Sequence, residues 1–351
     1  MPVSIVVGGQ YGSEGKGKVV ALLSRRVQSP WLVRCGGPNS GHTVTLNGES
    51  LILRQVPSSN DPENSVFCIA AGCVIDEPLL LNELELLRIT KDRILVDPRA
   101  VLLTQFDREQ EAQELSGIGS TFSGTGAALM RRMARRDEVL LAQDSSNIRT
   151  RCTITSVAPI LHAALKRHEQ VIVEGTQGFG LSLLHGADYP FLTSRDTTAS
   201  GFASEVGLSP HMIDEIVMVI RTYPIRVGGN SGPFANEITW NIVQEESGAP
   251  EVLPELTSVT KRLRRVARFD LEAVATACEY NQPNSLAVMG LDRLDFRNHK
   301  VSSWSKLTSS AQNFISEVEA KTKTPVSIVG TGFETADALY AEQPSGVKSY
   351  A

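Results

Sequence analysis

The feature that most constrains this chain is the stretch 8–18, which reads GGQYGSEGKGK. It follows an apolar run at 3–7, which predicts a buried strand, and it leads into a second apolar run at 19–23, which predicts a helix. Glycine lets a ligand approach the backbone closely. A glycine loop between a strand and a helix exposes N–H groups at the positive end of the helix dipole. The sequence therefore predicts a phosphate-binding loop rather than a simple tight turn.

This loop differs from an ordinary P-loop at one informative place. Residues 12–18 fit the pattern GxxxxGK, but Val19 stands where a serine or threonine would bind Mg²⁺. A P-loop ATPase is therefore not the favoured class. Lys16 and Lys18 still predict that the loop holds an anion.

Short apolar runs recur along the chain, and most of them end at glycine or at a polar loop. The alternation of such runs with helical spacing, as at 157–165, predicts an α/β fold with a largely parallel central sheet flanked by helices. Ligands of such sheets bind at the carboxyl ends of the strands. We expect a single domain over 1–351, with a frayed tail from about 343. The expected later strands are 31–35, 66–71, 171–173, 216–220, 286–289 and 326–329.

The composition argues against several classes of protein. The net charge is −5 and the pI is about 5.8, whereas a general nucleic-acid binder is usually basic. The five cysteines are scattered without metal-ligand or disulfide spacing, and no apolar run is long enough to span a membrane. We therefore expect a cytoplasmic protein with small-molecule substrates and without a nucleic-acid or membrane partner.

Further polar loops follow the first one. The stretch 36–43 reads GGPNSGHT. A lone loop histidine is more often a surface residue than a catalytic one, but His42 follows a predicted strand, where it can reach a ligand. The loop 118–126 is rich in hydroxyls and glycines and suits a phosphate monoester. Arg262 and Arg264 lie on one loop and suit a dicarboxylate, because arginine pairs bidentately with carboxylates.

The first two loops resemble those of the adenylosuccinate synthetase family, which read GxQxGDEGKGK and GGxNxGHT. The one departure in the first motif is Ser13, where the family has aspartate. The resemblance extends over about residues 3–335 and implies the P-loop-NTPase-like fold of that family. Looser matches are IGSTFSGTG at 118–126 to IGTTGRGIG, ARR at 134–136 to ARRG, EGTQG at 174–178 to EGAQG, ELTSVTKRLRR at 255–265 to EFGATTGRRRR, MGLD at 289–292 to TKLD, and GTG at 330–332 to STG.

The resemblance implies a ligase reaction that uses Mg²⁺. In the family, a nucleoside triphosphate transfers its γ-phosphate to O6 of IMP, and the amine of aspartate then displaces the phosphate. The aspartate of the first motif is the base and a Mg²⁺ ligand. The histidine of the second motif is an acid, and the glycine before it gives its carbonyl to the metal. These positions correspond here to Ser13, His42 and Gly41, so Ser13 and Gly41 are the implied metal ligands.

The same resemblance implies three groups of binding residues and a homodimer. In the family, an arginine from the neighbouring subunit holds the nucleotide phosphate, and Arg135 is the match here. The implied triphosphate site comprises Gly12, Ser13, Glu14, Gly15, Lys16, Gly17, Lys18, Gly41, His42, Thr43, Arg264, Gly290, Asp292, Gly330, Thr331 and Gly332. The implied nucleotide-substrate site comprises Ser13, Asn39, Ser40, Ser120, Thr121, Arg135, Gln177, Thr193 and Arg262. The implied aspartate site comprises Val259, Thr260, Arg262 and Arg264.

The serine at position 13 leaves three interpretations open. A serine hydroxyl is far less acidic than a carboxylic acid, so it cannot replace the aspartate as a base at neutral pH. The enzyme is then inactive, or it recruits another base such as Glu14, or its substrate differs. The family aspartate lies beside N1 and C2 of the purine, and a serine there leaves room for a 2-amino group.

We predict the third interpretation. A phage-associated branch of the family carries this serine and converts dGMP, aspartate and ATP into N6-succinyl-2-amino-2′-deoxyadenylate, for DNA in which 2-aminoadenine replaces adenine. The chain resembles that branch. Gly290 replaces the lysine of TKLD, which predicts a donor of ATP or dATP. One alternative is the conventional reaction with IMP, aspartate and GTP. Another is a catalytically inactive nucleotide-binding protein, against which the retention of His42, Arg262 and Arg264 argues.

Overall fold

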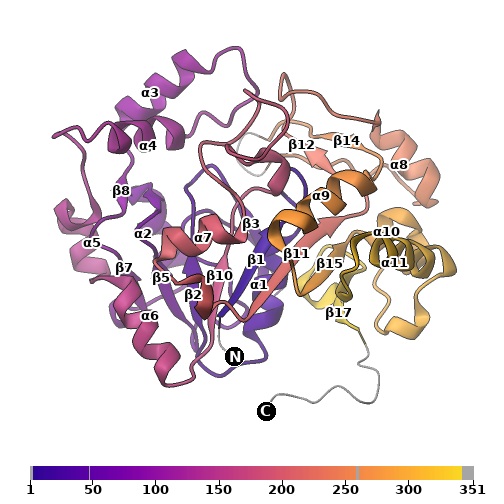
Figure 1. Cartoon of the computed structure of the whole chain (residues 1–351), viewed down its shortest axis with the longest axis horizontal. Helices are drawn as coiled ribbons and strands as arrows, with labels where there is room; N and C mark the ends of the chain where they lie inside the picture. Colours follow the sequence, from indigo (N-terminus) through magenta and orange to yellow (C-terminus); the bar gives the residue numbers. More distant parts are fainter. Residues whose placement is uncertain (1–2, 47, 258–260, 342–351) are drawn as a thin grey trace.

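The computed structural model describes residues 3–46, 48–257 and 261–341. The expected frayed tail and two predicted aspartate-binding residues, Val259 and Thr260, lie outside them. A ten-stranded sheet runs through the described chain in the order β17-β16-β15-β11-β1-β10-β2-β5-β7-β9 (Figure 1). Its strands are β1 (Val3–Gly8), β2 (Trp31–Arg34), β5 (Val66–Ile69), β7 (Ile94–Val96), β9 (Thr153–Ile154), β10 (Val171–Glu174), β11 (Glu215–Arg221), β15 (Ser285–Met289), β16 (Val326–Gly330) and β17 (Ala338–Tyr340).

Neighbouring strands of this sheet are parallel, except that β17 is antiparallel to β16 at one edge. In the middle of the sheet, Ile5 of β1 lies between Val173 of β10 and Ile216 of β11. Every residue of β1 is buried, as expected for a parallel strand covered on both faces. The predicted α/β fold with a largely parallel sheet is confirmed.

Helices flank this sheet and extend the molecule at both ends. Figure 1 shows α3 and α4 together at one end and α10 and α11 at the other. α1 begins at Lys16, earlier than the apolar run that predicted it, because Gly15 adopts a φ of 106° and turns the chain directly into the helix. The helices are α1 (Lys16–Ser24), α2 (Glu77–Leu86), α3 (Gln105–Glu114), α4 (Thr125–Met133), α5 (Ser146–Arg151), α6 (Val157–Lys166), α7 (Ala199–Val206), α8 (Trp240–Ser247), α9 (Leu271–Asn281), α10 (Leu291–Leu294) and α11 (Ser309–Thr322).

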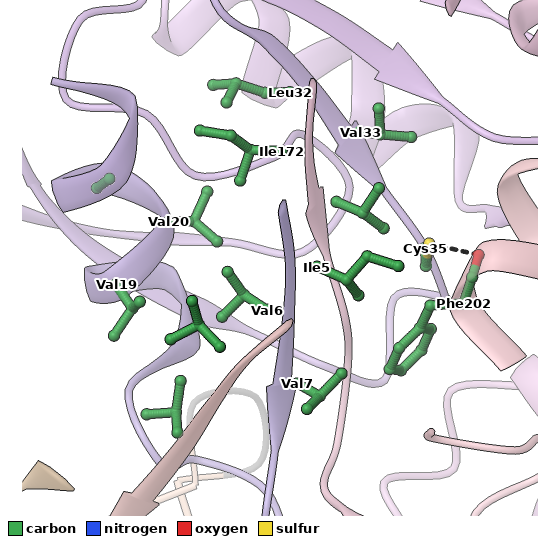
Figure 2. Close-up of a cluster of buried hydrophobic side chains, with 14 of the residues drawn as sticks. Ile5, Val6, Val7, Val19, Val20, Leu32, Val33, Cys35, Ile172 and Phe202 are labelled. Carbon is green, nitrogen blue, oxygen red and sulfur yellow. Dashed lines mark hydrogen bonds between the residues drawn. The ribbon is translucent and has the colours of Figure 1, made fainter. Parts of the chain in front are cut away.

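The main core lies on both faces of β1. Figure 2 shows Val6 on the side of α1, facing Val19 and Val20, while Ile5 and Val7 point to the opposite side. Successive side chains of a strand alternate between the two faces, so both layers of helices pack against β1. This packing holds the end of β1, and with it the glycine loop, at a defined place.

Three smaller sheets carry the polar loops that follow the main strands. The hairpin of β3 (His42–Leu46) and β4 (Glu49–Leu53) begins with the predicted catalytic histidine. β12 (Ile225–Arg226), β14 (Arg265–Ala267) and β13 (Glu237–Ile238) pack on α8. β6 (Val74–Ile75) pairs with β8 (Val101–Leu102). In the part of the chain that the structure describes, no helix has the length and apolarity needed to span a membrane.

Candidate active site

A cavity of about 620 Å³ opens at the carboxyl ends of β1, β11 and β15. This is the place where ligands bind in parallel α/β sheets, and the volume is within the range of ligand pockets, about 300–1,000 Å³. Most of the residues predicted to bind the triphosphate line this cavity; Gly12, Gly330 and Thr331 do not. The residues from the predicted set that line it are Ser13, Glu14, Gly15, Lys16, Gly17, Lys18, Gly41, His42, Thr43, Arg264, Gly290, Asp292 and Gly332.

Glu14 and Lys16 hold the glycine loop from within. Both side chains are buried, and Lys16 Nζ lies 2.6 Å from Glu14 Oε2. Glu14 Oε1 accepts a hydrogen bond from the N–H of Gly12 at 2.8 Å, and Lys16 also donates to the carbonyl oxygen of Gln177. A Cβ on Gly8 would lie 2.6 Å from both carboxylate oxygens, so this packing needs glycine there. The carboxylate of Glu14, the predicted candidate base, is therefore engaged in holding the loop.

Ser13 has the opposite environment. Its side chain is exposed and lines the cavity. Its φ of 57° is in the left-handed region, which serine adopts uncommonly. Its carbonyl oxygen accepts a hydrogen bond of 3.1 Å from Arg221 Nη1. Position 13 thus presents a hydroxyl to the cavity where the family has a carboxylate.

His42 is held by two buried charged residues. Its Nδ1 lies 2.6 Å from Glu174 Oε1, and Arg34 Nη1 lies 3.1 Å from Glu174 Oε2. Its Nε2 lies 3.3 Å from the hydroxyl of Ser40. Arg34 Nη1 also lies 2.8 Å from His42 Nδ1, so this ring nitrogen contacts both a carboxylate and a guanidinium, and together they fix the orientation of the ring.

Burial and the charge of Arg34 lower the pKa of His42 to about 4, so its imidazole is neutral at neutral pH. Burial also opposes ionisation of Glu174, but His42 and Arg34 together hold the pKa of that carboxyl below its usual range. Glu174 therefore stays ionised and orients the ring. An anion bound beside His42 would raise the pKa of the imidazole again.

Another part of the cavity wall follows β15. Gly290 has a φ of 80°, and a Cβ there would lie 3.1 Å from Thr222 Oγ1. Asp292 is buried and faces the same cavity. Lys18 Nζ donates to the carbonyl oxygen of Gly332 at 2.8 Å, and burial lowers the pKa of Lys18 to about 8. This part of the wall thus consists of a glycine, the carboxylate of Asp292 and the amine of Lys18, whose basicity is lowered by burial.

Residues 255–257 and 261–264 lie against each other, and several of them line the same cavity as the glycine loop. Leu256 bridges Leu263, and the N–H of Arg264 donates to the carbonyl oxygen of Glu255 at 2.9 Å. Arg264 lines the cavity, whereas Arg262 is exposed and is not part of its wall. The structure therefore brings one of the two predicted aspartate-binding arginines to the cavity.

The residues predicted for the nucleotide substrate are less closely gathered. Among the described residues that line the cavity, Ser13 is the one member of that set. Ser40 reaches the site through His42. Asn39 Oδ1 and Gln177 Oε1 are buried and make no hydrogen bond within the described chain. Buried polar atoms normally have partners, so these two amides are suited to a ligand.

The loop before α4 is organised by Glu111 of α3. Ser120 Oγ donates to Glu111 Oε1 at 3.2 Å, and the N–H of Gly126 donates to Glu111 Oε2 at 2.9 Å. Thr121 and Thr193 are half-buried. Beyond the end of α4, Arg135 is exposed. Its side chain is not among those that line the cavity.

Sequence reasoning missed several residues of the site. Arg34 and Glu174 support His42, and Arg221 and Phe333 line the cavity. A signal for the first three was present, because each is the last residue of a strand of the main sheet, where ligands bind. Phe333 is 70% exposed and no pattern in the sequence indicated it.

The residues present are compatible with Mg²⁺. The hydroxyl of Ser13 and the carbonyl of Gly41 belong to residues of the same cavity wall. Mg²⁺ prefers oxygen ligands and usually completes its shell with substrate phosphates and water. Among the described residues, no group of three histidine, cysteine, aspartate or glutamate side chains could hold a metal by itself. The chain thus offers few ligands, and phosphate oxygens would have to supply others.

The fold and the cavity define a nucleotide-binding α/β protein with a phosphate loop at the centre of its sheet. A family model described as "Adenylosuccinate synthetase" matches residues 5–143 and 137–299. The adenylosuccinate synthetases of Methanocaldococcus jannaschii and Thermococcus sibiricus are each 38% identical to this chain over 340 residues. The alignments cover 94% of this chain and 94% of the first relative, and 95% and 97% for the second. The chain therefore belongs to the adenylosuccinate synthetase family, and it is a ligase of purine nucleotide biosynthesis.

Two solved structures share the fold over nearly the whole chain. The fully ligated adenylosuccinate synthetase of Plasmodium falciparum has a TM-score of 0.86 at 21% identity, covering 97% of this chain and 100% of that chain. The succinoaminodeoxyadenylate synthetase of cyanophage S-2L, bound to dGMP and dATP as an energy donor, has a TM-score of 0.81 at 26% identity, covering 97% and 95%. The predicted fold of the family is confirmed.

Proposed function

We propose that this ligase joins aspartate to dGMP, with ATP or dATP as the donor, to give N6-succinyl-2-amino-2′-deoxyadenylate, the nucleoside diphosphate and phosphate. The observation that carries the proposal is the exposed hydroxyl of Ser13, at the position where the family aspartate stands beside N1 and C2 of the purine. A serine leaves room for the 2-amino group of guanine and removes a negative charge. The neighbouring carboxylate of Glu14 does not replace the aspartate, because it is bound to Lys16 and to the loop.

One structural neighbour supports the same substrates. The cyanophage S-2L enzyme, 26% identical to this chain, was solved with dGMP and with dATP as an energy donor. Its identity to this chain is lower than that of the archaeal relatives, so Ser13 remains the main support.

The chain's own residues fit named roles in this reaction. The triphosphate lies along the glycine loop, whose N–H groups and Lys16 hold phosphate oxygens. Mg²⁺ held by those oxygens with Ser13 and Gly41 would neutralise the charge that develops on them. The negative phosphoryl oxygens make His42, which Glu174 orients, more basic as they approach, and the imidazole that is protonated as a result donates a hydrogen bond to them. O6 attacks the γ-phosphorus while the bond to the nucleoside diphosphate breaks, and the N1 proton of guanine passes to water. The aspartate amine then adds at C6, the O6 phosphate leaves, and the amine releases one proton to water.

Arg264 provides the site for the amino-acid substrate. It faces the cavity beside the glycine loop, and a guanidinium pairs with a carboxylate through two hydrogen bonds. Arg262 is exposed and does not line the cavity, so its side chain would have to move to reach the same ligand.

The part of the cavity wall that would contact the base of the donor is compatible with adenine. Gly290 carries no side chain to lie against a guanine ring, and Phe333 offers an exposed aromatic face beside it. Stacking on an aromatic ring does not depend on the identity of the base. We therefore propose ATP or dATP as the donor.

Arg135 and the nucleotide-binding residues support a homodimer. Arg135 is exposed beyond the end of α4 and is not part of the wall of its own chain's cavity. We propose that it holds the nucleotide phosphate across a two-fold axis, as the matching arginine does in the family.

The conventional activity is the second candidate, and a specific observation favours it. Relatives at 35–38% identity over nearly the whole chain carry the name adenylosuccinate synthetase. On this view the substrates are IMP, aspartate and GTP, and a group other than an aspartate at position 13 removes the N1 proton. The sequence relatives support this candidate better than they support dGMP.

One activity panel separates the two candidates. IMP, GMP and dGMP are each combined with aspartate and with ATP, dATP or GTP, and kcat/KM is measured for every pair. The proposal expects the largest value for dGMP with ATP or dATP. A larger value for IMP with GTP would reject the proposal and establish the conventional activity. The absence of any product from every pair would indicate an inactive nucleotide-binding protein.

A further inference from the structure

One guanidinium connects the glycine loop to Glu255, whose backbone is hydrogen-bonded to that of Arg264. Arg221 is the last residue of β11, and its side chain is buried. Its Nη1 donates to the carbonyl oxygen of Ser13 at 3.1 Å and to Glu255 Oε2 at 3.1 Å, and its Nη2 donates to Glu255 Oε1. All three residues line the cavity.

The backbone of Arg221 is also held in place by hydrogen bonds. The backbone N–H of Arg221 donates to Gln10 Oε1 at 3.0 Å, and Gln10 Nε2 donates to the carbonyl oxygen of Arg221 at 3.1 Å. Gln10 belongs to the glycine loop and is buried. The end of β11 and the glycine loop are therefore joined twice, once through the backbone and once through the guanidinium.

The contact with Ser13 determines the direction of a loop N–H. A trans peptide is planar, so the N–H of Glu14 points away from the carbonyl oxygen of Ser13. Because Arg221 holds that oxygen, it also fixes the direction of the N–H on the other side of the peptide. Ser13 has a φ of 57°, so its peptide is held in a conformation that serine rarely adopts alone.

The contact with Glu255 determines the position of Arg264. The carbonyl oxygen of Glu255 accepts the N–H of Arg264 at 2.9 Å, and Arg264 Nε donates to the carbonyl oxygen of Leu256 at 3.2 Å. A displacement of Glu255 therefore carries Arg264 with it. The carboxylate of Glu255 is matched to the charge of Arg221, so this link is an ion pair with two hydrogen bonds.

We infer that Arg221 is a positioning residue that couples binding of the triphosphate at the glycine loop to binding of a dicarboxylate at Arg264. A ligand at either end orders the shared link, so the second ligand meets a smaller cost of ordering. The inference rests on the proposed function for the chemical class of the two ligands. It does not depend on which purine nucleotide is the acceptor.

The test measures this coupling by calorimetry on the full chain with Mg²⁺. The probes are L-malate, a dicarboxylate without the reactive amine, and whichever of AMP-PNP and GMP-PNP binds more tightly. In the wild type, saturating L-malate is expected to lower the Kd of the triphosphate analogue by about 5-fold or more, the usual lower range of allosteric coupling. Arg221→Lys keeps the charge but loses the fork, and Glu255→Gln keeps the shape but loses the charge. Both are expected to reduce the factor to about 1.

A matched control comes from another arginine–glutamate pair. Arg268 pairs with Glu246 at 2.5 Å outside this cavity, so Arg268→Lys should keep the coupling of the wild type. Coupling that persists in both Arg221→Lys and Glu255→Gln would overturn the inference, as would its absence from a wild type that binds both probes. Glu255 is partly exposed, so its variant stays informative if Arg221→Lys does not fold. A wild type that binds neither probe would reject the proposed function together with the inference.

Discussion

The two sides of the site, named here for the proposed phosphate donor and the proposed phosphate acceptor, differ in how their polar groups are paired. On the donor side, buried charged groups are paired within the chain, whereas on the acceptor side several polar groups have no partner among the described residues. The donor side comprises the glycine loop 8–18 and the cavity above it, where Lys16 pairs with Glu14. The acceptor side comprises the loop 118–126, the residues 134–136 that follow α4, and the residues 175–193. There, Gln177 has an unpaired buried oxygen, and Arg135 is exposed.

The difference shows two ways of building a binding site. The donor side is preorganised, because its charged groups already hold one another in the geometry that receives phosphate. We propose that the acceptor side is completed from outside, by the nucleotide and by a second copy of the chain. Substitution of a paired, buried charge on the donor side should therefore change the stability of the protein as well as its activity, whereas substitution of the exposed Arg135 on the acceptor side should change activity alone.

The largest effect is expected for Lys16→Ala. It leaves the carboxylate of Glu14 buried without its cation, which costs about 3–5 kcal/mol when one partner of a buried pair is removed. Urea denaturation measures the loss in free energy of unfolding. Lys261→Ala is the control, because this lysine is exposed at the same cavity and should change the free energy by less than about 0.5 kcal/mol. Equal losses for both variants would remove the distinction between the two sides.

A somewhat smaller effect is expected from the titration of His42. Its pKa is about 4 in the folded protein, against about 6.5 when unfolded. Between these values the unfolded chain binds a proton that the folded chain does not, so stability falls as the pH falls from 6.5 to 4, by up to about 3 kcal/mol. His42→Gln should flatten this part of the profile, and a bound triphosphate analogue that raises the folded-state pKa of His42 should reduce the loss of stability. An unchanged slope in His42→Gln would assign the titration to another group.

A moderate effect is expected for Ser13→Asp, at the boundary of the two sides. Aspartate tolerates the left-handed φ at this position, supplies a base for IMP and crowds the 2-amino group of guanine. We expect the ratio of kcat/KM for dGMP over IMP to fall about 10–200-fold, the range for one small group in a pocket. Ser13→Asn is the control, since it adds the same bulk without the base. A ratio that stays constant in Ser13→Asp would move the specificity to other residues of the pocket.

The smallest effect on stability, and a large one on activity, is expected for Arg135→Ala. The side chain is exposed, so the free energy of unfolding should change by less than about 0.5 kcal/mol. Hybrid dimers of Arg135→Ala chains with His42→Ala chains should recover part of the lost turnover, because one of their sites is then complete. Arg136→Ala, the neighbouring exposed arginine, should keep its activity. Verified hybrids without recovery would place Arg135 and His42 in the site of the same chain.

The fold could be predicted from the sequence because its signals are local. The run at 3–7, the glycines that follow it and the apolar runs at 171–173 and 216–220 each report on a few neighbouring residues. Together they determine a parallel sheet with a phosphate loop at its centre. The same holds for the donor side, whose groups are close in sequence: Glu14 and Lys16 are two residues apart.

The features of the site that could not be predicted depend on contacts between segments that are distant in the sequence. His42 and Glu174 are separated by 132 positions, and no pattern predicts that their side chains meet. Arg221 and Ser13 are separated by 208 positions. The hydrogen bonds of Glu14 within the loop were also not predictable. A carboxylate beside a glycine is equally consistent with a group that contacts the ligand and with a group that stabilises the loop.

Gly290 has a consequence for how this chain can change over evolutionary time. Its φ of 80° penalises any residue with a side chain, and the nearest atom to a new Cβ, Thr222 Oγ1 at 3.1 Å, is already hydrogen-bonded to the Gly290 carbonyl oxygen. A single substitution that restored the lysine of the family would therefore meet backbone strain and crowding before it gained any contact with a guanine base. We therefore expect a side chain at position 290 to be accommodated only together with a change at Thr222, so that the two positions change as a pair.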